Sequence, residues 1–196
     1  SPPCTGEREF SVFVLDQSGS MGDTDISPYR YAAAVEATAC FIQARREIGA
    51  KDQYAAVVFN SYAQVVCNHA TPGNAERDIL HPLRQINPYD GTDIGEGLDM
   101  AGRLLPNDPG GFRQRIILLT DGHGGEPYAL AKELKNRKIL IDTIGVGGSP
   151  SAVDEPCLRT IASVVDGKVR YRFITDKDQL VNHFKTIARD LVKIHR

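Results

Sequence analysis

The amino-acid sequence predicts a doubly wound α/β domain with helices on both faces of a largely parallel sheet. The first observation is that short apolar runs alternate with helix-like patterns along nearly the whole chain, which is typical of this class. The second is that 196 residues, 41% of them hydrophobic, suffice for one core of ordinary size. We expect residues 1–7 to be a lead-in and residues 8–196 to be a single domain excised from a larger protein.

The predicted strands and helices follow from composition and from the turn residues that separate them. Short runs rich in Val, Ile and Phe and bounded by turn residues predict strands, and longer runs with a helical period predict helices. The expected strands are 10–15, 54–59, 62–67, 115–120, 140–146 and 169–174; the expected helices are 28–48, 74–86, 94–105, 127–137, 153–164 and 177–192.

Two local signals fix details of this order. Ser27-Pro28 predicts an N-cap followed by proline at the first helical position. Asn60-Ser61 separates two apolar strands by only two residues, which forces those strands to be antiparallel. An antiparallel strand at the edge of an otherwise parallel sheet is common, so we expect one here.

Oxygen-bearing side chains gather at the ends of two predicted strands. The first strand ends in Asp16, with hydroxyls following at Ser18 and Ser20, and the strand 115–120 is followed by Asp121. Ligands of open α/β sheets collect outside the carboxyl ends of the strands. Thr92 lies in a loop dense in turn residues, and topology should bring that loop to the same edge. Hard divalent cations take oxygen ligands, so this set predicts a magnesium site.

This set of residues resembles a known motif. It consists of Asp16-Gln-Ser18-Gly-Ser20, then Gly91-Thr92 before a helix, then Thr120-Asp121-Gly122 after an apolar strand. Its order and setting are similar to the metal-ion-dependent adhesion site of von Willebrand factor type A domains, and the resemblance extends over about residues 8–192.

The resemblance implies a Rossmann-like sheet of five parallel strands plus one antiparallel edge strand, with Mg²⁺ or Mn²⁺ at its upper edge. It implies that Ser18, Ser20 and Thr92 bind the ion directly and that Asp16 and Asp121 act largely through bound water. A shell of hydroxyls and water leaves the ion short of negative charge. An Asp or Glu carboxylate from a protein partner is expected to complete it.

The sequence departs from the family pattern at two places. Some family members have a second metal site with two acidic residues just beyond the serines; here Asp23 occupies the first place and Thr24 the second. A second site is therefore not expected. The threonine of the family often follows two glycines, whereas here it follows Asp90-Gly91, which adds negative charge to the rim.

Simpler interpretations apply to several polar residues. Asp and Ser also stabilise turns and helix starts without a metal, which is the alternative for the first loop. Asp93 is expected to cap the helix that begins near Ile94, and His123 and Glu126 to be solvated loop residues. The pairs Arg45-Arg46 and Arg113-Gln-Arg115 are expected to be ordinary charged ends of elements.

Composition excludes few classes of partner. The 23 basic and 25 acidic side chains create no overall field, so we expect no nucleic-acid partner. The four cysteines are scattered, which favours reduced thiols and a cytoplasmic location. No apolar run in the chain is long enough to cross a bilayer.

These observations favour a metal-dependent protein-interaction module rather than an enzyme. The sequence has no P-loop, HExxH, GxSxG or Rossmann GxGxxG motif, and no side chain is evidently poised as a general base. Two alternatives stay open: an accessory subunit of an AAA-ATPase or chelatase-like assembly, and a hydrolase that uses the ion as a Lewis acid.

Overall fold

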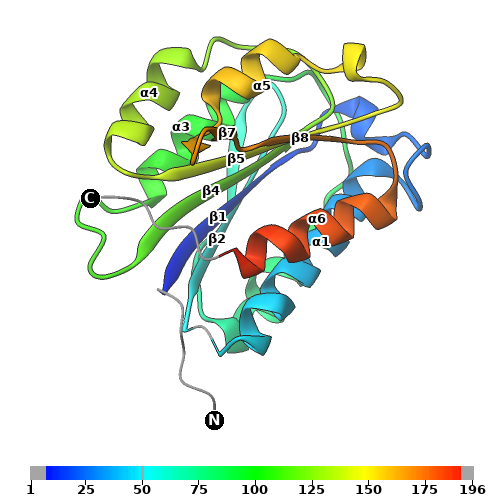
Figure 1. The fold of residues 1–196 in the computed structure, drawn as a ribbon. Helices are drawn as coiled ribbons and strands as arrows, with labels where there is room; N and C mark the ends of the chain where they lie inside the picture. Colours follow the sequence, from blue (N-terminus) through cyan, green and yellow to red (C-terminus); the bar gives the residue numbers. More distant parts are fainter. Residues whose placement is uncertain (1–7, 50, 191–196) are drawn as a thin grey trace.

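The computed structural model describes residues 8–49 and 51–190, and they form a six-stranded sheet between two layers of helices (Figure 1). The strand order is β3-β2-β1-β4-β5-β8, with β3 antiparallel at one edge and the other five strands parallel. The strands are β1 (Glu9–Asp16), β2 (Gln53–Phe59), β3 (Ala63–Ala70), β4 (Arg113–Thr120), β5 (Leu140–Val146) and β8 (Tyr171–Ile174). The predicted fold class is therefore confirmed.

Each face of the sheet has its own hydrophobic core. Alternate residues of a strand point to opposite faces, and in β1 Phe13 and Leu15 pack on one side while Val12 and Val14 pack on the other. The first face is covered by α1 (Arg30–Glu47), α2 (His81–Arg84) and α6 (Lys177–Arg189); the second is covered by α3 (Ile94–Leu104), α4 (Tyr128–Asn136) and α5 (Glu155–Ile161) (Figure 1). All eight residues of β1 and all eight of β4 are buried, as expected for central strands.

The predicted start of the first helix was wrong. The Ser27-Pro28 peptide bond is cis, α1 begins at Arg30, and its N-cap is Tyr29, with no side-chain capping bond. Tyr29 has an extended backbone (φ −161°, ψ 161°), so Pro28 lies before the helix rather than at its first position.

The predicted helix over 74–86 is broken into shorter pieces. It comprises a 3-10 turn (Pro72–Asn74), a π-helical turn (Glu76–Leu80) and α2. Pro82 lacks the N–H that an unbroken α-helix would require at that position, which accounts for the change of hydrogen-bond register there.

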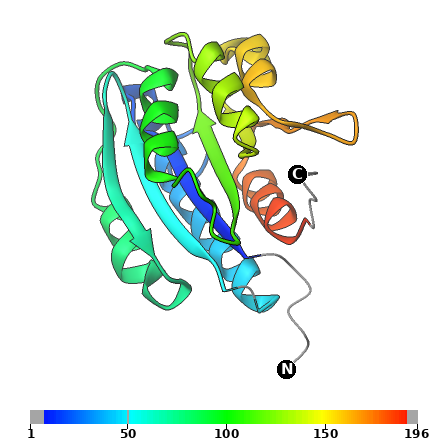
Figure 2. The same cartoon turned by 90° about the vertical axis from the view of Figure 1, so that its left-hand side faces the viewer.

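The predicted elements near the carboxyl terminus are shorter than expected. Helix α5 covers 155–161 rather than 153–164, and the chain then forms a small hairpin of β6 (Val164–Val165) and β7 (Lys168–Val169) before the edge strand β8. This hairpin projects from the body of the domain (Figure 2). The end of the predicted helix 177–192 and the lead-in 1–7 lie wholly or partly outside the described residues.

A network of buried charges crosses the amino-terminal edge of the sheet, where ordinary charged ends had been predicted. Arg45 is 1% exposed and Arg115 fully buried. Glu9 forms ion pairs with Arg113, with Arg115 at 3.4 Å and with Arg45 at 3.6 Å. Arg46 is exposed as predicted, but for Arg45, Arg113 and Arg115 the prediction was wrong. It treated each Arg locally, whereas the carboxylates that compensate these charges come from other parts of the chain.

The network extends through two further carboxylates. Arg45 Nε donates to Asp52 at 2.6 Å, and Arg115 Nε donates to Asp142 at 2.9 Å. Asp142 also accepts from Arg170 at 2.7 Å. Since a buried charge is tolerated only when it is paired and hydrogen-bonded, these contacts fix the relative positions of α1 and of the strands β1, β4 and β5.

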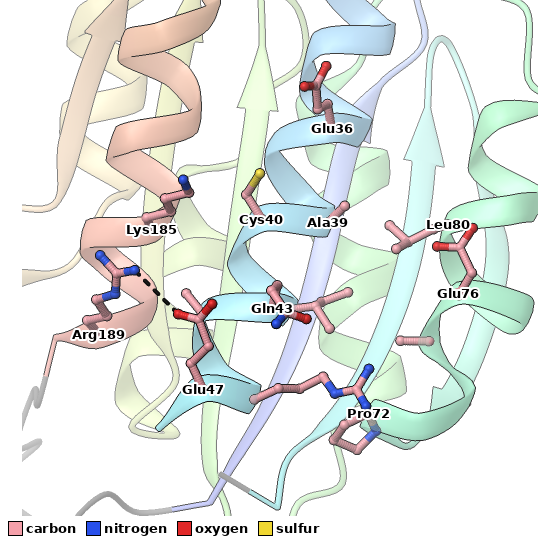
Figure 3. A pocket seen from close by; sticks show the side chains of 14 residues that line it. Glu36, Ala39, Cys40, Gln43, Glu47, Pro72, Glu76, Leu80, Lys185 and Arg189 are labelled. Carbon is pink, nitrogen blue, oxygen red and sulfur yellow. Dashed lines mark ion pairs between the residues drawn. The ribbon is translucent and has the colours of Figure 1, made fainter. Parts of the chain in front are cut away.

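A hollow of about 460 Å³ lies on the outer face of α1, between α6 and the helical turns that follow β3 (Figure 3). Its floor includes Ala39 and Leu80, and its rim carries charged side chains such as Glu47, which pairs with Arg189 at 3.6 Å. None of the five predicted metal ligands lines it.

Within 8–49 and 51–190, no helix combines the length and the apolar character of a membrane span.

Candidate metal centre

Two neighbouring parallel strands carry the predicted aspartates to one point. Asp16 is the last residue of β1, and Asp121 directly follows β4. These strands pair in register, with Leu15 opposite Leu119. Because parallel strands end at the same edge, residues that lie 105 positions apart in sequence come close enough for Asp121 N to donate to Asp16 Oδ2 at 3.4 Å.

Asp16 is buried and hydrogen-bonded on both oxygens. Oδ1 accepts from Ser18 N at 2.7 Å, and Oδ2 accepts from Thr120 Oγ1 at 2.8 Å. Burial, and then the negative charge of Asp121, raises the pKa of Asp16 to about 6. Two close carboxylates in a poorly solvated site repel each other, so a cation placed between them would be stabilising.

Ser20 links Asp121 to Ser18. Ser20 Oγ donates to Asp121 Oδ1 at 2.9 Å, and the two serine hydroxyl oxygens lie 3.4 Å apart. Ser18 is 2% exposed, while Ser20 lies at the exposed rim of the loop. Four of the five predicted ligands thus form one hydrogen-bonded group built from the loops after β1 and β4.

Thr92 lies beside this group on a third loop. Asp90 O accepts from Gly19 N at 3.0 Å, and Gly124 O accepts from Ile94 N at 3.0 Å, so the loop before α3 is bonded to both of the others. The Thr92 hydroxyl lies 3.6 Å from the place that a Cβ at Gly122 would occupy. At Gly124, where φ is +149°, a Cβ would collide with the Thr92 carbonyl oxygen. Glycine at this position therefore permits the close approach of the two loops.

The simpler interpretations hold for some neighbours. Asp93 is the N-cap of α3, and its side chain accepts from Glu96 N at 3.3 Å, as predicted. His123 is 58% exposed, and its Nδ1 lies 3.8 Å from Asp154. The carboxylates of Asp23 and Asp25 both form ion pairs with the guanidinium of Arg30, with N–O distances of 3.6 and 2.6 Å.

Arg30 is a residue of the site that the sequence analysis missed. It is the first residue of α1, and its Nη1 donates to Asp121 Oδ2 at 2.9 Å while Nε and Nη2 bind Asp25. These partners raise its pKa, so it is a permanent cation. Thr120, which orients Asp16, was also missed as a functional group. A polar residue at the end of an apolar strand was the only sequence signal for Thr120, and none pointed to Arg30.

The donor set fits a hard divalent cation. Metal–oxygen distances of about 2.1 Å place adjacent ligands of an octahedral ion about 3 Å apart. The serine oxygens, at 3.4 Å, are close to that spacing. Among the described residues, no group of three His, Cys, Asp or Glu side chains is arranged to hold a metal. The donors are mainly hydroxyls, which suits Mg²⁺ or Mn²⁺ better than a soft metal.

The chain is thus an α/β domain whose open sheet carries hydroxyl and carboxylate oxygens at its carboxyl edge. Residues 11–123 match the family model described as "von Willebrand factor type A domain". This match covers more than half of the chain. The chain belongs to the von Willebrand factor type A domain family.

Relatives of known name are larger proteins. The chain is 32% identical to calcium-activated chloride channel regulator 1 of Bos taurus over 180 residues, which is 89% of this chain and 18% of that protein. It is 26% identical to a UPF0353 protein of Mycolicibacterium paratuberculosis over 215 residues, which is 94% of this chain and 61% of that protein. The chain thus spans less than two thirds of either relative.

Solved structures share the fold. Pilus adhesin SpaC from Lactobacillus rhamnosus GG superposes with a TM-score of 0.78 at 17% identity, over 96% of this chain and 31% of that one. Proximal thread matrix protein 1 from the mussel byssus, with a zinc-occupied MIDAS motif, gives a TM-score of 0.73 at 22% identity, over 94% of this chain and 46% of that one. BatB from Bacteroides thetaiotaomicron gives 0.71 at 21% identity, over 93% and 100%.

Proposed function

We propose that this domain is a metal-dependent protein-interaction module. Ser18, Ser20 and Thr92 would hold Mg²⁺ or Mn²⁺ through their hydroxyls, with Asp16 and Asp121 acting through water. The ion would supply a positive charge that attracts an Asp or Glu carboxylate from a partner. Membership of a family whose domains typically serve in adhesion and protein interaction supports this proposal.

The observation that carries the proposal is the bond between Ser20 and Asp121. It joins residues 101 positions apart and brings hydroxyl and carboxylate oxygens of two loops to one point at the exposed edge of the sheet. The two buried carboxylates lie close together, and the charge of Asp121 disfavours ionisation of Asp16. A cation bound between them would relieve this repulsion.

The proposed ligands and Arg30 would both leave a bound ion with much of its positive charge. The two serines and Thr92 are neutral, so they bind the ion without cancelling its charge. Arg30 compensates part of the charge of Asp121, since its guanidinium is 2.9 Å from that carboxylate. The ion would therefore keep enough positive charge to attract a carboxylate from a partner.

Metal titration with matched variants tests the first half of this proposal. Isothermal titration calorimetry with Mg²⁺ and Mn²⁺ should show one site in the natural chain and a loss of at least tenfold in affinity in Ser18→Ala. Ser149→Ala, in the loop after β5, is the matched control and should bind as the natural chain does. Equal affinity in Ser18→Ala would contradict the proposal.

Partner capture tests the second half. Proteins retained from an extract by the natural chain in Mg²⁺, but lost with EDTA and with Asp16→Ala, are candidate partners. Substituting Asn or Gln for acidic residues of a captured partner should then abolish binding. An assay for phosphatase or esterase turnover addresses the hydrolase alternative, which requires turnover that disappears in Ser18→Ala.

A further inference from the structure

Exposed tyrosines lie at the edge of the sheet that carries the candidate metal centre, in the β2–β3 link, in the loop of Thr92 and at the start of α4. Tyr62 is 73% exposed, Tyr89 60% and Tyr128 47%. Among the described residues, the other large hydrophobic side chains with comparable exposure are valines. An exposed tyrosine offers a large contact area at a small cost in conformational entropy, and tyrosine is enriched in binding hot spots.

Hydrogen bonds tie two of these tyrosines to the loop of the predicted ligands. Tyr62 N donates to Asn60 Oδ1 at 3.0 Å, and Asn60 Nδ2 donates to the carbonyl oxygen of Tyr89 at 3.3 Å. Tyr89 N in turn donates to Gln17 O at 2.8 Å, and Gln17 is the neighbour of Ser18. The backbones of Tyr62 and Tyr89 are therefore held next to the site.

The third tyrosine, Tyr128, lies at the end of the loop that follows β4. Tyr128 is the first residue of α4, and the loop that leads to it begins at Asp121. That loop is joined to the loop of Tyr89 by the bond from Ile94 N to Gly124 O, at 3.0 Å. Tyrosines are thus placed on the loop of Thr92, on the neighbouring β2–β3 link and at the start of α4, close to where a bound segment would pass.

The same edge of the sheet is strongly acidic. The connecting residues at this edge, 17–29, 60–62, 87–93, 121–127, 147–154 and 175–176, contain no Lys or Arg, although the whole chain has 23 basic residues. The acidic residues in them are Asp23, Asp25, Asp90, Asp93, Asp121, Glu126, Asp154 and Asp176.

Arg30, a cation beside this edge, already binds two carboxylates. Arg30, at the start of α1, binds Asp25 and Asp121, and its side chain is 12% exposed. Asp90 and Glu126 are exposed, and they flank the predicted ligands Thr92 and Asp121 in sequence. A bound metal ion would therefore be a small positive centre inside a negatively charged face.

We propose that the partner presents its metal-binding carboxylate on a segment in which Lys or Arg side chains flank that acidic residue. This inference rests on the proposed function and specifies the partner. The flanking cations would lie against the acidic rim and over the tyrosine rings, since ammonium and guanidinium groups are attracted to the faces of aromatic rings. A segment rich in acidic residues would be repelled by the same rim.

Synthetic nonapeptides test the inference directly. Each carries one central Asp between Gly and Ser residues, with two flanking positions set to Lys, Ala or Glu, and a dye for fluorescence anisotropy. A second set replaces the central Asp with Asn. In 5 mM MgCl₂ and 50 mM NaCl, roughly tenfold tighter binding is expected for the Lys-flanked than for the Glu-flanked peptide. The difference should shrink in 500 mM NaCl because salt screens exposed charges.

Variants of the domain locate the contact. In Tyr62→Ala/Tyr89→Ala, the affinity for the Lys-flanked peptide should fall roughly three- to tenfold, while the affinity for Mg²⁺ measured by calorimetry stays unchanged. Asp90→Asn/Glu126→Gln should reduce the preference for Lys over Glu. The controls are Val164→Ala, on the exposed hairpin, and Glu133→Gln, on the exposed face of α4; neither should alter the preference.

The outcomes separate the inference from the function on which it rests. Binding that needs both Mg²⁺ and the central Asp, but shows no preference for Lys or prefers Glu, overturns the inference and leaves the proposed function standing. If no peptide binds in a Mg²⁺-dependent way, or if the Asn peptides bind as tightly as the Asp peptides, both fail. A Mg²⁺-dependent preference for Lys that the tyrosine variant does not weaken removes the tyrosines from the proposal.

Discussion

Arg30 Nη1 donates to Asp121 Oδ2 at 2.9 Å, while Ser20 Oγ donates to the other oxygen of the same carboxylate at 2.9 Å. Asp121 is therefore held between a cation of α1 and a hydroxyl of the loop after β1. A guanidinium so close to a candidate metal ligand acts in two ways. Under the proposed function it would lower the negative charge available to the metal, and it would leave a bound ion with more positive charge for a partner.

The first prediction concerns this pair. In Arg30→Gln, the removal of a positive charge from the neighbourhood of a dication should raise the affinity for Mg²⁺ roughly three- to tenfold. The affinity for carboxylate peptides should fall. Calorimetry with Mg²⁺ and peptide anisotropy measure the two effects separately. Arg103→Gln, which breaks the exposed pair with Asp99, is the control. Weaker Mg²⁺ binding in Arg30→Gln would instead mean that Arg30 positions Asp121.

The second prediction concerns Asp16. Burial disfavours its charged form, so Asp16→Asn without metal at pH 8 should have a free energy of unfolding equal to or above that of the natural chain. Mg²⁺ at 100 times its Kd should stabilise the natural chain by about 2.7 kcal/mol and leave the variant unchanged. Urea denaturation measures both. Asp93→Asn keeps a good cap and should keep the Mg²⁺ response; an equal response in Asp16→Asn would refute this role.

The third prediction concerns the contact between two loops. In Gly124→Ala, the new methyl group would collide with the Thr92 carbonyl, so the loop of Thr92 must move. Affinity for Mg²⁺ should fall at least threefold, and stability should fall by about 1–3 kcal/mol. Gly73→Ala, where nothing lies within 4 Å of the added carbon, should show neither change. Unaltered Mg²⁺ affinity in Gly124→Ala would remove Thr92 from the set of ligands.

The fourth prediction concerns the buried charges at the opposite edge. Arg115→Met leaves Glu9 and Asp142 without one of their buried partners. The expected loss is about 3–5 kcal/mol in urea denaturation, because an uncompensated buried charge is costly. Arg103→Ala breaks an exposed pair and should cost about 1 kcal/mol or less. Comparable small losses in both variants would show that the network does not hold the sheet.

The fifth prediction concerns pH. Burial, and then the charge of Arg172, lowers the pKa of His183 to about 4; Arg170 and Arg115 act in the same direction and Asp142 opposes them. An unfolded chain binds this proton near pH 6.5. Between pH 6.5 and 4 the unfolded state therefore binds more protons at this position, and stability contributed by His183 is lost as the pH falls.

The expected contribution is up to about 1.4 kcal/mol for each pH unit in that window. His183→Gln, which has no titrating group at this position, should show a shallower decline of unfolding free energy between pH 6.5 and 4. His81→Gln, on an exposed residue of α2, is the control. Parallel declines in the natural chain and in His183→Gln would contradict the assignment.

Local signals in the sequence were sufficient for the class of fold. Apolar runs of strand length alternate with helical patterns, and the short link predicted at Asn60-Ser61, which the structure extends to 60–62, forces β2 and β3 to be antiparallel. The boundaries were less predictable. Ser27-Pro28 predicted a helix start, but α1 begins at Arg30, after the extended residue Tyr29.

The candidate ligands were also visible in the sequence, since Asp16 ends an apolar strand, Ser18 and Ser20 follow in the next loop, and Asp121 directly follows another apolar strand. Arg30 was not visible. Its role depends on the direction in which α1 leaves its turn, because that direction aims the guanidinium at Asp121. No spacing along the chain encodes a contact between residues that lie 91 positions apart.

By itself, then, the sequence determined the α/β class, the antiparallel edge and the residue types gathered at strand ends, because these depend on periodicity and neighbours. Only the tertiary structure decided which charges are compensated. Arg115 is buried because Glu9 and Asp142 reach it from neighbouring strands, and Asp121 is shared between Ser20 and Arg30. The physical reason is that the cost of a charge depends on its burial and its partners, and folding alone brings those partners together.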